Sequence, residues 1–342
     1  MEYIYPKIDP TNIDLEAADV STDDIRSFHS WVSSPNEEGL TVAVVDSGID
    51  ENHPVFEGIE IEHQDMTGQE TSRRDLVSHG TACAGLIVQL APIKKLIDVR
   101  VFGREGRTTG EVLMRAYDHL LKRADEIDLA NFSLGTSRKV DALDARQNQL
   151  VAKGIRTVSA AGNSGQDTNS SPAAAKRSFS AGALTIDGEM TDFSAWSNEH
   201  NSPTIAALGK NIRLARAEGT SMGQVLDENW VMASGTSFAC PITLAALANY
   251  MAYYNRFSRS DFTTTADEIT EAPTDGQGIL DLEEAMEAGK LDKSEEGEST
   301  ITTHMGVQQY GNKNIAWFHS KLFEPGSYEV TKEGNNLKVE DK

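Results

Sequence analysis

Residues 233–254 read ASGTSFACPITLAALANYMAYY, and this stretch decides the fold. From Phe238 onward nearly every residue is apolar, as in a helix that is buried on all sides. Pro241 is tolerated near the start of such a helix, where its missing N–H has no intrahelical partner to lose. The helix is therefore predicted to begin at about Ser237, where free N–H groups and the helix dipole stabilise negative charge.

Upstream of this helix, short β-branched segments alternate with helical ones. Strand-like patterns cover residues 40–46, 96–103, 127–135 and 155–163, and helix-like patterns cover residues 79–90, 108–126 and 144–154. Strands that alternate with helices imply crossover connections and a mostly parallel sheet with helices on both faces. The predicted fold is therefore α/β, with three layers and a mostly parallel central sheet.

The length of 342 residues fits one large α/β domain with an appendage. Residues 1–37 are polar and acidic and are predicted to form an N-terminal extension. Residues 38–290 carry the α/β pattern and are predicted to form the main domain. Residues 291–342 begin with a charged linker and continue with weak alternation and turn signals, which predict a small β-rich C-terminal appendage.

Composition and charge argue against several classes of function. The formal net charge of −22 opposes nucleic-acid binding, because phosphate neutralisation needs clustered Lys and Arg. No run of about 18 apolar residues marks a membrane span, and no secretory signal opens the chain. Cys83 and Cys240 lie in apolar helical patterns and are predicted to be buried free thiols. We therefore expect a cytoplasmic protein without nucleic-acid or membrane partners, and the sequence carries no signal for an oligomeric state.

Four polar residues stand at junctions between predicted strands and helices. Asp46 and Asn163 end strands, whereas His79 and Ser237 begin helices. In such sheets functional groups gather at the carboxyl ends of the strands. A serine that attacks a carbonyl needs an imidazole base, a carboxylate that orients the imidazole, and donors for the oxyanion. Each residue alone also has a structural explanation, as a turn former, a core histidine or an N-cap, but the four together favour acyl transfer.

The segments around these residues read VVDSGI (44–49), SHGTACAG (78–85), AAGNSG (160–165) and SGTSFACP (234–241). In order and context they resemble the signature segments of the subtilisin-like serine proteases, the subtilases, of the intracellular type. The order Asp, His, Ser is the order of that family and differs from the orders in chymotrypsin-like proteases and α/β-hydrolases. The resemblance covers about residues 38–290 and implies the subtilisin-like fold.

The resemblance also implies a role for each residue. Ser237 would be the nucleophile, His79 the general base, and Asp46 the carboxylate that orients His79. The Asn163 side chain and the backbone N–H of Ser237 would form the oxyanion hole. Four further residues would bind the substrate: Ser133, Leu134, Gly135 and Gly162.

The expected partner is a protein or peptide substrate, and no cofactor or metal is expected to take part in the reaction. Many subtilases bind calcium through loop oxygens, and Asp65, Glu70 and Asp75 are the candidates here, without the spacing of an EF-hand. Cys83 lies one helical turn after His79. Some subtilases with a free cysteine at this position are sensitive to mercurials, so we expect the same of this chain.

The leading hypothesis is a serine endopeptidase that hydrolyses peptide bonds through an acyl-enzyme. One alternative is a maturation protease that trims a single partner, such as a peptide precursor or a viral protein. Another is a pseudoprotease that serves as a binding scaffold. Intracellular subtilisins carry a short N-terminal extension across the active site, and residues 3–7, YIYPK, are predicted to act in this way. A disordered tail is the alternative for this segment.

Overall fold

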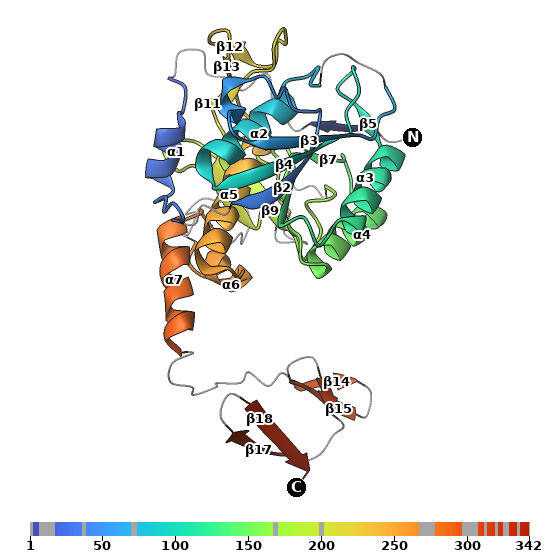
Figure 1. Cartoon of the computed structure of the whole chain (residues 1–342), viewed down its shortest axis with the longest axis vertical. Coiled ribbons are helices and arrows are strands. Elements are labelled where there is room, and N and C mark those ends of the chain that lie inside the picture. Colours follow the sequence, from blue (N-terminus) through green and yellow to red (C-terminus); the bar gives the residue numbers. More distant parts are fainter. Residues whose placement is uncertain are drawn as a thin grey trace. The chain divides into compact units, whose positions relative to one another are not determined.

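A computed structural model gives the structure of the chain, which divides into two compact units, Met1–Leu291 and Asp292–Lys342. The residues that the structure describes are 3–6, 18–35, 39–69, 74–166, 170–197, 202–266, 278–295, 307–310, 313–318, 321–323, 328–333 and 336–341. All four signature-like segments lie in the first unit (Figure 1).

The first unit is built around a seven-stranded sheet with the strand order β10-β9-β8-β6-β2-β4-β3. All pairings within this sheet are parallel. After β2 the chain first adds β3 and β4 on one side of it, and then adds β6, β8, β9 and β10 on the other side. The direction of the strand order therefore reverses at β2, and α/β sheets bind their ligands at the carboxyl ends of the strands at such a point. The predicted α/β fold with a mostly parallel sheet is confirmed. The strands are β2 (Leu40–Asp46), β3 (Glu60–Asp65), β4 (Ile93–Arg100), β6 (Leu129–Phe132), β8 (Arg156–Ala160), β9 (Phe179–Leu184) and β10 (Ile205–Leu208).

Helices cover both faces of this sheet (Figure 1). Val42 and Val44 of β2 belong to one buried cluster together with the residues of α2 and α5. Ala43 and Val45 belong to a second cluster with the residues of α3 and α4. Alternate side chains of one strand thus enter two cores, which explains why β2 is apolar at successive positions. The helices are α2 (His79–Leu90), α3 (Gly110–Lys122), α4 (Asp141–Ala152) and α5 (Thr236–Tyr254).

The buried helix α5 departs in one respect from the prediction. It begins at Thr236, so Pro241 is its sixth residue. The prediction that this proline removes no helical bond is wrong, because an amide at position 241 would donate to the carbonyl of Ser237, four residues earlier. The carbonyl of Ser237 is bound by side chains of other elements instead.

The N-terminal residues add a strand to the first unit. β1 (Tyr3–Pro6) lies antiparallel between β5 (Thr108–Thr109) and β7 (Leu134–Gly135) in a three-stranded sheet. β1 therefore pairs with Leu134 and Gly135, two of the residues that are predicted to bind the substrate. The opposed pairs are Tyr3–Thr109, Ile4–Thr108, Tyr5–Gly135 and Pro6–Leu134.

The first unit also includes α1 (Thr22–Phe28), which the sequence groups with the N-terminal extension. Ser21 and Asp24 form a capping box at its start, and Ile25 is fully buried in the main core. The helix α1 therefore packs into the core of the first unit. The other elements up to residue 295 are η1 (Pro54–Phe56), β11 (Ile212–Ala215), β12 (Gln224–Val225), β13 (Trp230–Ala233), α6 (Arg259–Thr263) and α7 (Leu282–Glu295).

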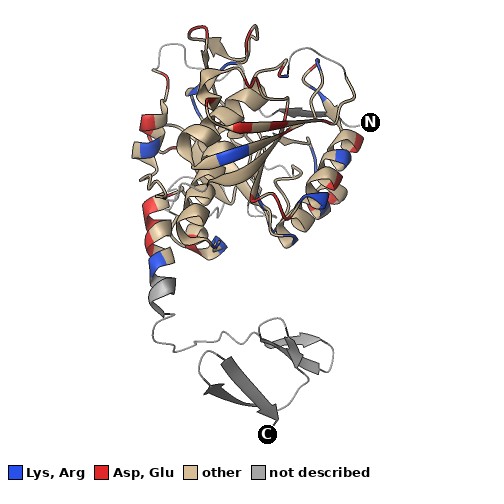
Figure 2. Ribbon diagram, viewed as in Figure 1, with Lys and Arg blue, Asp and Glu red and all other residues tan. Residues whose placement is uncertain are grey.

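The second unit consists of antiparallel strands in two small sheets, ordered β14-β15-β16 and β17-β18. Among the described residues, no helix combines the length and the apolar character that a membrane crossing requires. On α1 and α3 basic residues stand beside acidic ones (Figure 2), as in the ion pair Arg115–Glu111. The strands of the second unit are β14 (Val307–Tyr310), β15 (Lys313–Phe318), β16 (Lys321–Phe323), β17 (Tyr328–Glu333) and β18 (Asn336–Asp341).

Candidate active site

Asp46 ends β2 and points its carboxylate at His79, the first residue of α2. Nδ1 of His79 lies 2.7 Å from Oδ1 of Asp46, and both side chains are fully buried. The backbone N–H of Ser47 donates to the same oxygen at 2.7 Å. A carboxylate can only accept here, so Nδ1 of His79 carries a proton, and in the neutral form of the ring Nε2 is the nitrogen without one. This arrangement leaves Nε2 of His79 as a base.

The start of α2 lies unusually close to the turn that follows β2. A Cβ atom at Gly80 would lie 2.2 Å from the carbonyl oxygen of Gly48 and 3.1 Å from Cβ of Asp46. Real Cβ atoms do not approach a backbone oxygen so closely, so only glycine fits at position 80. This contact explains why a glycine follows the histidine, and it seats His79 beside Asp46.

A second buried carboxylate, Asp75, braces this contact. It accepts from the backbone N–H groups of Val77, Ser78 and Thr81 at 2.8 to 3.0 Å and from the hydroxyl of Ser47 at 2.9 Å. Burial raises the pKa of Asp75, and the donors, led by Thr81, oppose the rise. Asp75 thus satisfies free N–H groups at the start of α2 and ties them to the β2 turn. From the sequence, Asp75 was predicted only as a possible calcium ligand.

Ser237 is the second residue of α5, and its hydroxyl donates to the backbone carbonyl of Ser133 at 3.1 Å. The ring of His79 lies 5.8 Å from the ring of the next residue, Phe238, measured between centroids. Cys83, one turn after His79 in α2, reaches the carbonyl of Ser237 at 3.5 Å. The structure therefore brings Asp46, His79 and Ser237 together at the carboxyl edge of the sheet.

The base is unengaged in this arrangement. Nε2 of His79 is buried and has no hydrogen-bond partner among the described residues, and the same holds for Oδ2 of Asp46. The Ser237 hydroxyl is directed to the Ser133 carbonyl in this arrangement. Buried polar atoms without partners are rare in proteins and mark sites where a group is held ready for a reaction or a ligand.

Asn163 follows β8 and lies against the start of α5. Its Oδ1 accepts from the backbone N–H of Thr236 at 3.0 Å and from the Thr236 hydroxyl at 2.8 Å. The Thr236 hydroxyl accepts in turn from the N–H of Gly162 at 3.1 Å. Because two donors of Thr236 hold the Oδ1 atom, the NH₂ group of the Asn163 amide points away from Thr236. Thr236 was not singled out by the sequence analysis, although it is the direct neighbour of Ser237.

The predicted substrate-binding residues come from two places in the chain, around β7 and after β8. Leu134 and Gly135 form β7, and Ser133 precedes it. Gly162 has a positive φ of 119°, a backbone conformation that glycine adopts without strain. The carbonyl of Ser171 accepts from the N–H of Thr136, just after β7, at 2.9 Å. Of the four predicted residues, Ser133 contacts Ser237 and Gly162 contacts its neighbour Thr236.

Cys83 gives the site a third group with affinity for metals. Ligand atoms of Asp46, His79 and Cys83 lie within 4.8 Å of one another. Burial, followed by the charge of Asp46, raises the pKa of the Cys83 thiol well above its ordinary value. A protonated thiol is a poor ligand for hard cations, but it reacts with soft metals such as mercury. Both cysteines are buried and free, as expected.

The carboxylates considered for calcium have other partners. Asp65 forms two hydrogen bonds with the guanidinium of Arg100, at 3.2 and 2.5 Å, and Asp75 is bound by the donors described above. Glu70 lies outside the described residues.

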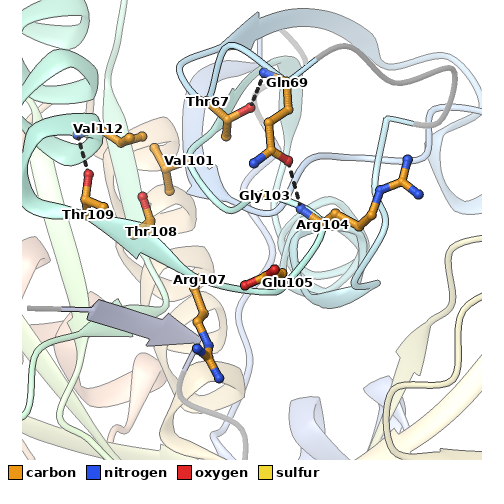
Figure 3. A pocket seen from close by; sticks show the side chains of 10 residues that line it. All are labelled: Thr67, Gln69, Val101, Gly103, Arg104, Glu105, Arg107, Thr108, Thr109 and Val112. Carbon is orange, nitrogen blue, oxygen red and sulfur yellow. Dashed lines mark hydrogen bonds between the residues drawn. The ribbon is translucent and has the colours of Figure 1, made fainter.

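A pocket of about 420 Å³ lies beside β5 (Figure 3). The side chain of Gln69 enters it and accepts from the backbone N–H of Arg104 at 3.1 Å. The pocket lies next to β5, which pairs with β1, and none of Asp46, His79 or Ser237 lines the pocket. The residues that line it are Thr67, Gln69, Val101, Gly103, Arg104, Glu105, Arg107, Thr108, Thr109 and Val112.

Known proteins share both this sequence pattern and this fold. A chain in the crystal structure of a cold adapted subtilisin-like serine proteinase superposes with a TM-score of 0.61 at 24% identity, over 73% of this chain and 91% of that chain. The thermophilic serine proteinase of Bacillus sp. strain AK1 is 28% identical over 72% of this chain and 61% of its own length. The major intracellular serine protease of Bacillus subtilis strain 168 is 27% identical over 67% of this chain and 73% of its own length.

A fungal protein is more similar in sequence. The subtilisin-like serine protease Rho m 2.0101 of Rhodotorula mucilaginosa is 32% identical over 262 residues, which are 72% of this chain and 73% of that protein. The profile of the Subtilase family matches residues 37–284, which include Asp46, His79, Asn163 and Ser237. This match covers most of the chain, and the four residues lie at junctions between strands and helices around the parallel sheet. The chain therefore belongs to the subtilase family.

Proposed function

We propose that the protein is a serine endopeptidase that hydrolyses peptide bonds through an acyl-enzyme on Ser237. The observation that carries the proposal is the buried pair of Asp46 and His79, 2.7 Å apart. The other nitrogen of His79, beside the first turn of α5, has no hydrogen-bond partner in the part of the chain that the structure describes. A histidine whose Nδ1–H is held by a carboxylate presents Nε2 to a hydroxyl as a base.

In the proposed reaction the Ser237 hydroxyl leaves the Ser133 carbonyl and gives its proton to Nε2 of His79 as its oxygen attacks the substrate carbonyl carbon. The negative charge that develops on the substrate oxygen is held by the N–H of Ser237 and the amide NH₂ of Asn163. His79 then returns the proton to the leaving amine, which separates as the acyl-enzyme forms. Water repeats the same steps and releases the acid. His79 carries every proton in this scheme, so the proposal includes no cofactor.

We further propose that a substrate lies as an extended strand along β7, as β1 does. The pairing of Pro6 with Leu134 and of Tyr5 with Gly135 satisfies the backbone of this edge. One position further along the same register lies opposite Ser133, whose carbonyl is 3.1 Å from the Ser237 hydroxyl. β1 therefore occupies the path of a substrate, which supports the hypothesis that the N-terminal extension restrains the enzyme. Residue 7 lies outside the described residues.

The other functional hypotheses receive unequal support. A pseudoprotease would not need Asp46, His79 and Asn163 in these orientations, so the arrangement of the site favours an active enzyme. A narrow maturation protease and a general peptidase would share this site. The similarity to an intracellular protease of Bacillus subtilis supports the proposed cytoplasmic location, and a protein or peptide is the proposed substrate.

A fluorophosphonate probe tests the mechanism, because it reacts with an activated serine and requires no particular peptide sequence. The full chain is compared with Ser237→Ala, and we expect labelling of the first protein alone. Equal labelling of the two proteins would reject Ser237 as the nucleophile. A peptide library then separates the remaining alternatives: labelling without cleavage of the library supports a narrow maturation protease, whereas cleavage of many sequences supports a general peptidase.

A further inference from the structure

The carbonyl of Ser237 lacks its usual helical partner. In an α-helix the carbonyl of each residue accepts from the N–H four residues later. For Ser237 that residue is Pro241, which has no N–H. The helix α5 spans both residues, so the backbone donor that an α-helix normally supplies to this carbonyl is missing.

Two side chains from other elements take the place of the missing donor. The hydroxyl of Ser133 donates to the Ser237 carbonyl at 2.7 Å, and the thiol of Cys83 reaches it at 3.5 Å. A thiol is the weaker donor and lies farther away. The Ser133 hydroxyl is therefore the main partner of this carbonyl.

Ser133 binds the nucleophile residue a second time through its backbone. Its carbonyl accepts from the Ser237 hydroxyl at 3.1 Å, while its own hydroxyl donates to the Ser237 carbonyl. Both residues are fully buried. Because Ser133 precedes β7, this double contact joins the nucleophile to the edge on which a substrate strand is proposed to lie.

The Ser133 hydroxyl is itself held in place. Nδ2 of Asn131, on β6, donates to it at 2.9 Å. Oδ1 of Asn131 accepts from the thiol of Cys240 at 3.2 Å, and Cys240 lies one turn after Ser237 in α5. The contacts form a closed ring that runs from Ser237 through Ser133, Asn131 and Cys240 back to the same helix, so each member has a fixed orientation.

We propose that the Ser133 hydroxyl is a positioning group for the nucleophile, and that Pro241 leaves the Ser237 carbonyl available for it. This inference rests on the proposed function of Ser237. A bond to that carbonyl fixes the ψ angle of Ser237 and therefore the direction of its side chain relative to β7. The position of the nucleophile relative to the substrate strand is then fixed. This matters because a misplacement of about 1 Å can cost roughly a hundredfold in rate.

The test is a double-mutant cycle with Ser133→Ala and Pro241→Ala in the full chain. Loss of one hydrogen bond predicts that Ser133→Ala lowers both kcat and the rate of fluorophosphonate labelling by about tenfold, with little change in KM. Pro241→Ala supplies the missing backbone N–H. The double variant should therefore recover part of the activity that Ser133→Ala loses, so that the two effects do not multiply.

Ser180→Ala is the matched control. The Ser180 hydroxyl, on β9, is also buried; it accepts from the N–H of Thr204 at 2.9 Å and lies 3.1 Å from the Thr204 hydroxyl. Its removal makes the same chemical change away from Ser237 and should leave labelling nearly unchanged. Ser133→Cys keeps a weak donor and should fall between the parent and Ser133→Ala, which gives a graded series even if the alanine variant does not fold.

Three results would overturn the inference: an effect of Ser133→Ala no larger than that of Ser180→Ala, an effect on KM alone, or single effects that multiply in the double variant. Each of them leaves the proposed function intact, because the parent chain is still labelled. Failure of the proposed function has a different outcome, since labelling of the parent would then match labelling of Ser237→Ala.

Discussion

Nδ1 of His79 lies 2.7 Å from Oδ1 of Asp46, and neither side chain is reached by solvent. Burial strengthens this contact, because water neither competes for the two atoms nor screens the charge of the carboxylate. The proton on Nδ1 is thereby fixed, and the imidazole has one nitrogen left with which to accept another. The geometry of this pair leads to the first prediction.

Asp46→Asn should lower kcat by about 10⁴, because an amide at this place can donate to Nδ1 and favours the wrong tautomer of His79. Labelling by the fluorophosphonate should slow in parallel. Asp261→Asn is the control, since Asp261 is a buried carboxylate that binds Tyr250 and Ser258 and not the site. Similar losses in the two variants would mean that the effect reflects damage to the fold.

Asn163 should matter for a different reason. Asn163→Ala is expected to reduce kcat by about 10² to 10³ with little change in KM, a range known for one oxyanion donor of a subtilisin. Asn163→Asp keeps an oxygen for the two donors of Thr236 but removes the NH₂ group. It should therefore be at least as inactive as the alanine variant. An aspartate variant with parent-like kcat would show that the side chain serves only to bind Thr236.

The sequence predicted the parts of the site that depend on topology. Asp46 and Asn163 follow parallel strands, and His79 and Ser237 begin helices, so the sheet itself brings these junctions to one edge. The motifs then indicated which of these junctions are expected to carry chemistry. No knowledge of side-chain packing was needed for this step.

The contacts that depend on the paths of loops were not predictable in this way. Asp75 was considered as a metal ligand, whereas its carboxylate binds N–H groups at the start of α2. Pro241 was judged harmless because the sequence cannot show that Ser133, about a hundred residues earlier, supplies a donor for Ser237. The error on Pro241 concerns a hydrogen bond between distant segments, and the contacts of Asp75 depend on the path of the loop before α2, neither of which the residue pattern encodes.

Removal of the N-terminal strand should increase activity. Deletion of residues 1–10 exposes the edge of β7 that pairs with Tyr5 and Pro6, so peptide cleavage is expected to rise through a lower apparent KM. The deletion should change fluorophosphonate labelling less than it changes peptide cleavage, because the small probe needs no strand pairing. Addition of a peptide that spans residues 1–10 should inhibit the truncated protein. Unchanged peptidase activity after the deletion would contradict a restraining role.

Cys83 predicts sensitivity to mercurials. Its sulfur lies within 4.8 Å of ligand atoms of both Asp46 and His79, so a mercury atom bound there would displace the imidazole. We expect p-chloromercuribenzoate or Hg²⁺ to inactivate the parent and to leave Cys83→Ala largely active. Cys240→Ala is the matched control, because Cys240 is also buried and free but bonds to Asn131. Protection by the Cys240 substitution instead would place the reactive thiol at α5.

His29 predicts that acid destabilises the first unit. Its Nδ1–H donates to the carbonyl of Leu280 at 2.8 Å, and its Nε2 accepts from the N–H of Leu208 at 3.1 Å. The ring therefore joins three segments in its neutral form. Burial lowers its pKa from 6.5 to about 4, against the opposing effects of the Leu280 carbonyl and Asp281.

Because the pKa of the folded state is the lower one, the unfolded chain binds the proton first as the pH falls. The stabilisation is complete above about pH 6.5 and is lost progressively down to about pH 4. At about 1.4 kcal/mol for each unit between these values, the loss approaches about 3 kcal/mol. Urea unfolding of Ser237→Ala, a background that prevents autolysis, should therefore show a free energy of unfolding that declines across this range.

The added substitution His29→Gln removes the titrating ring and keeps a neutral polar side chain. The double variant should be less stable at pH 7 than Ser237→Ala alone, because glutamine does not reproduce both ring hydrogen bonds. Its free energy of unfolding should fall less steeply between pH 6.5 and 4, so the two curves converge in acid. Parallel curves across that range would show that other groups cause the acid sensitivity and that His29 is already protonated in the folded protein.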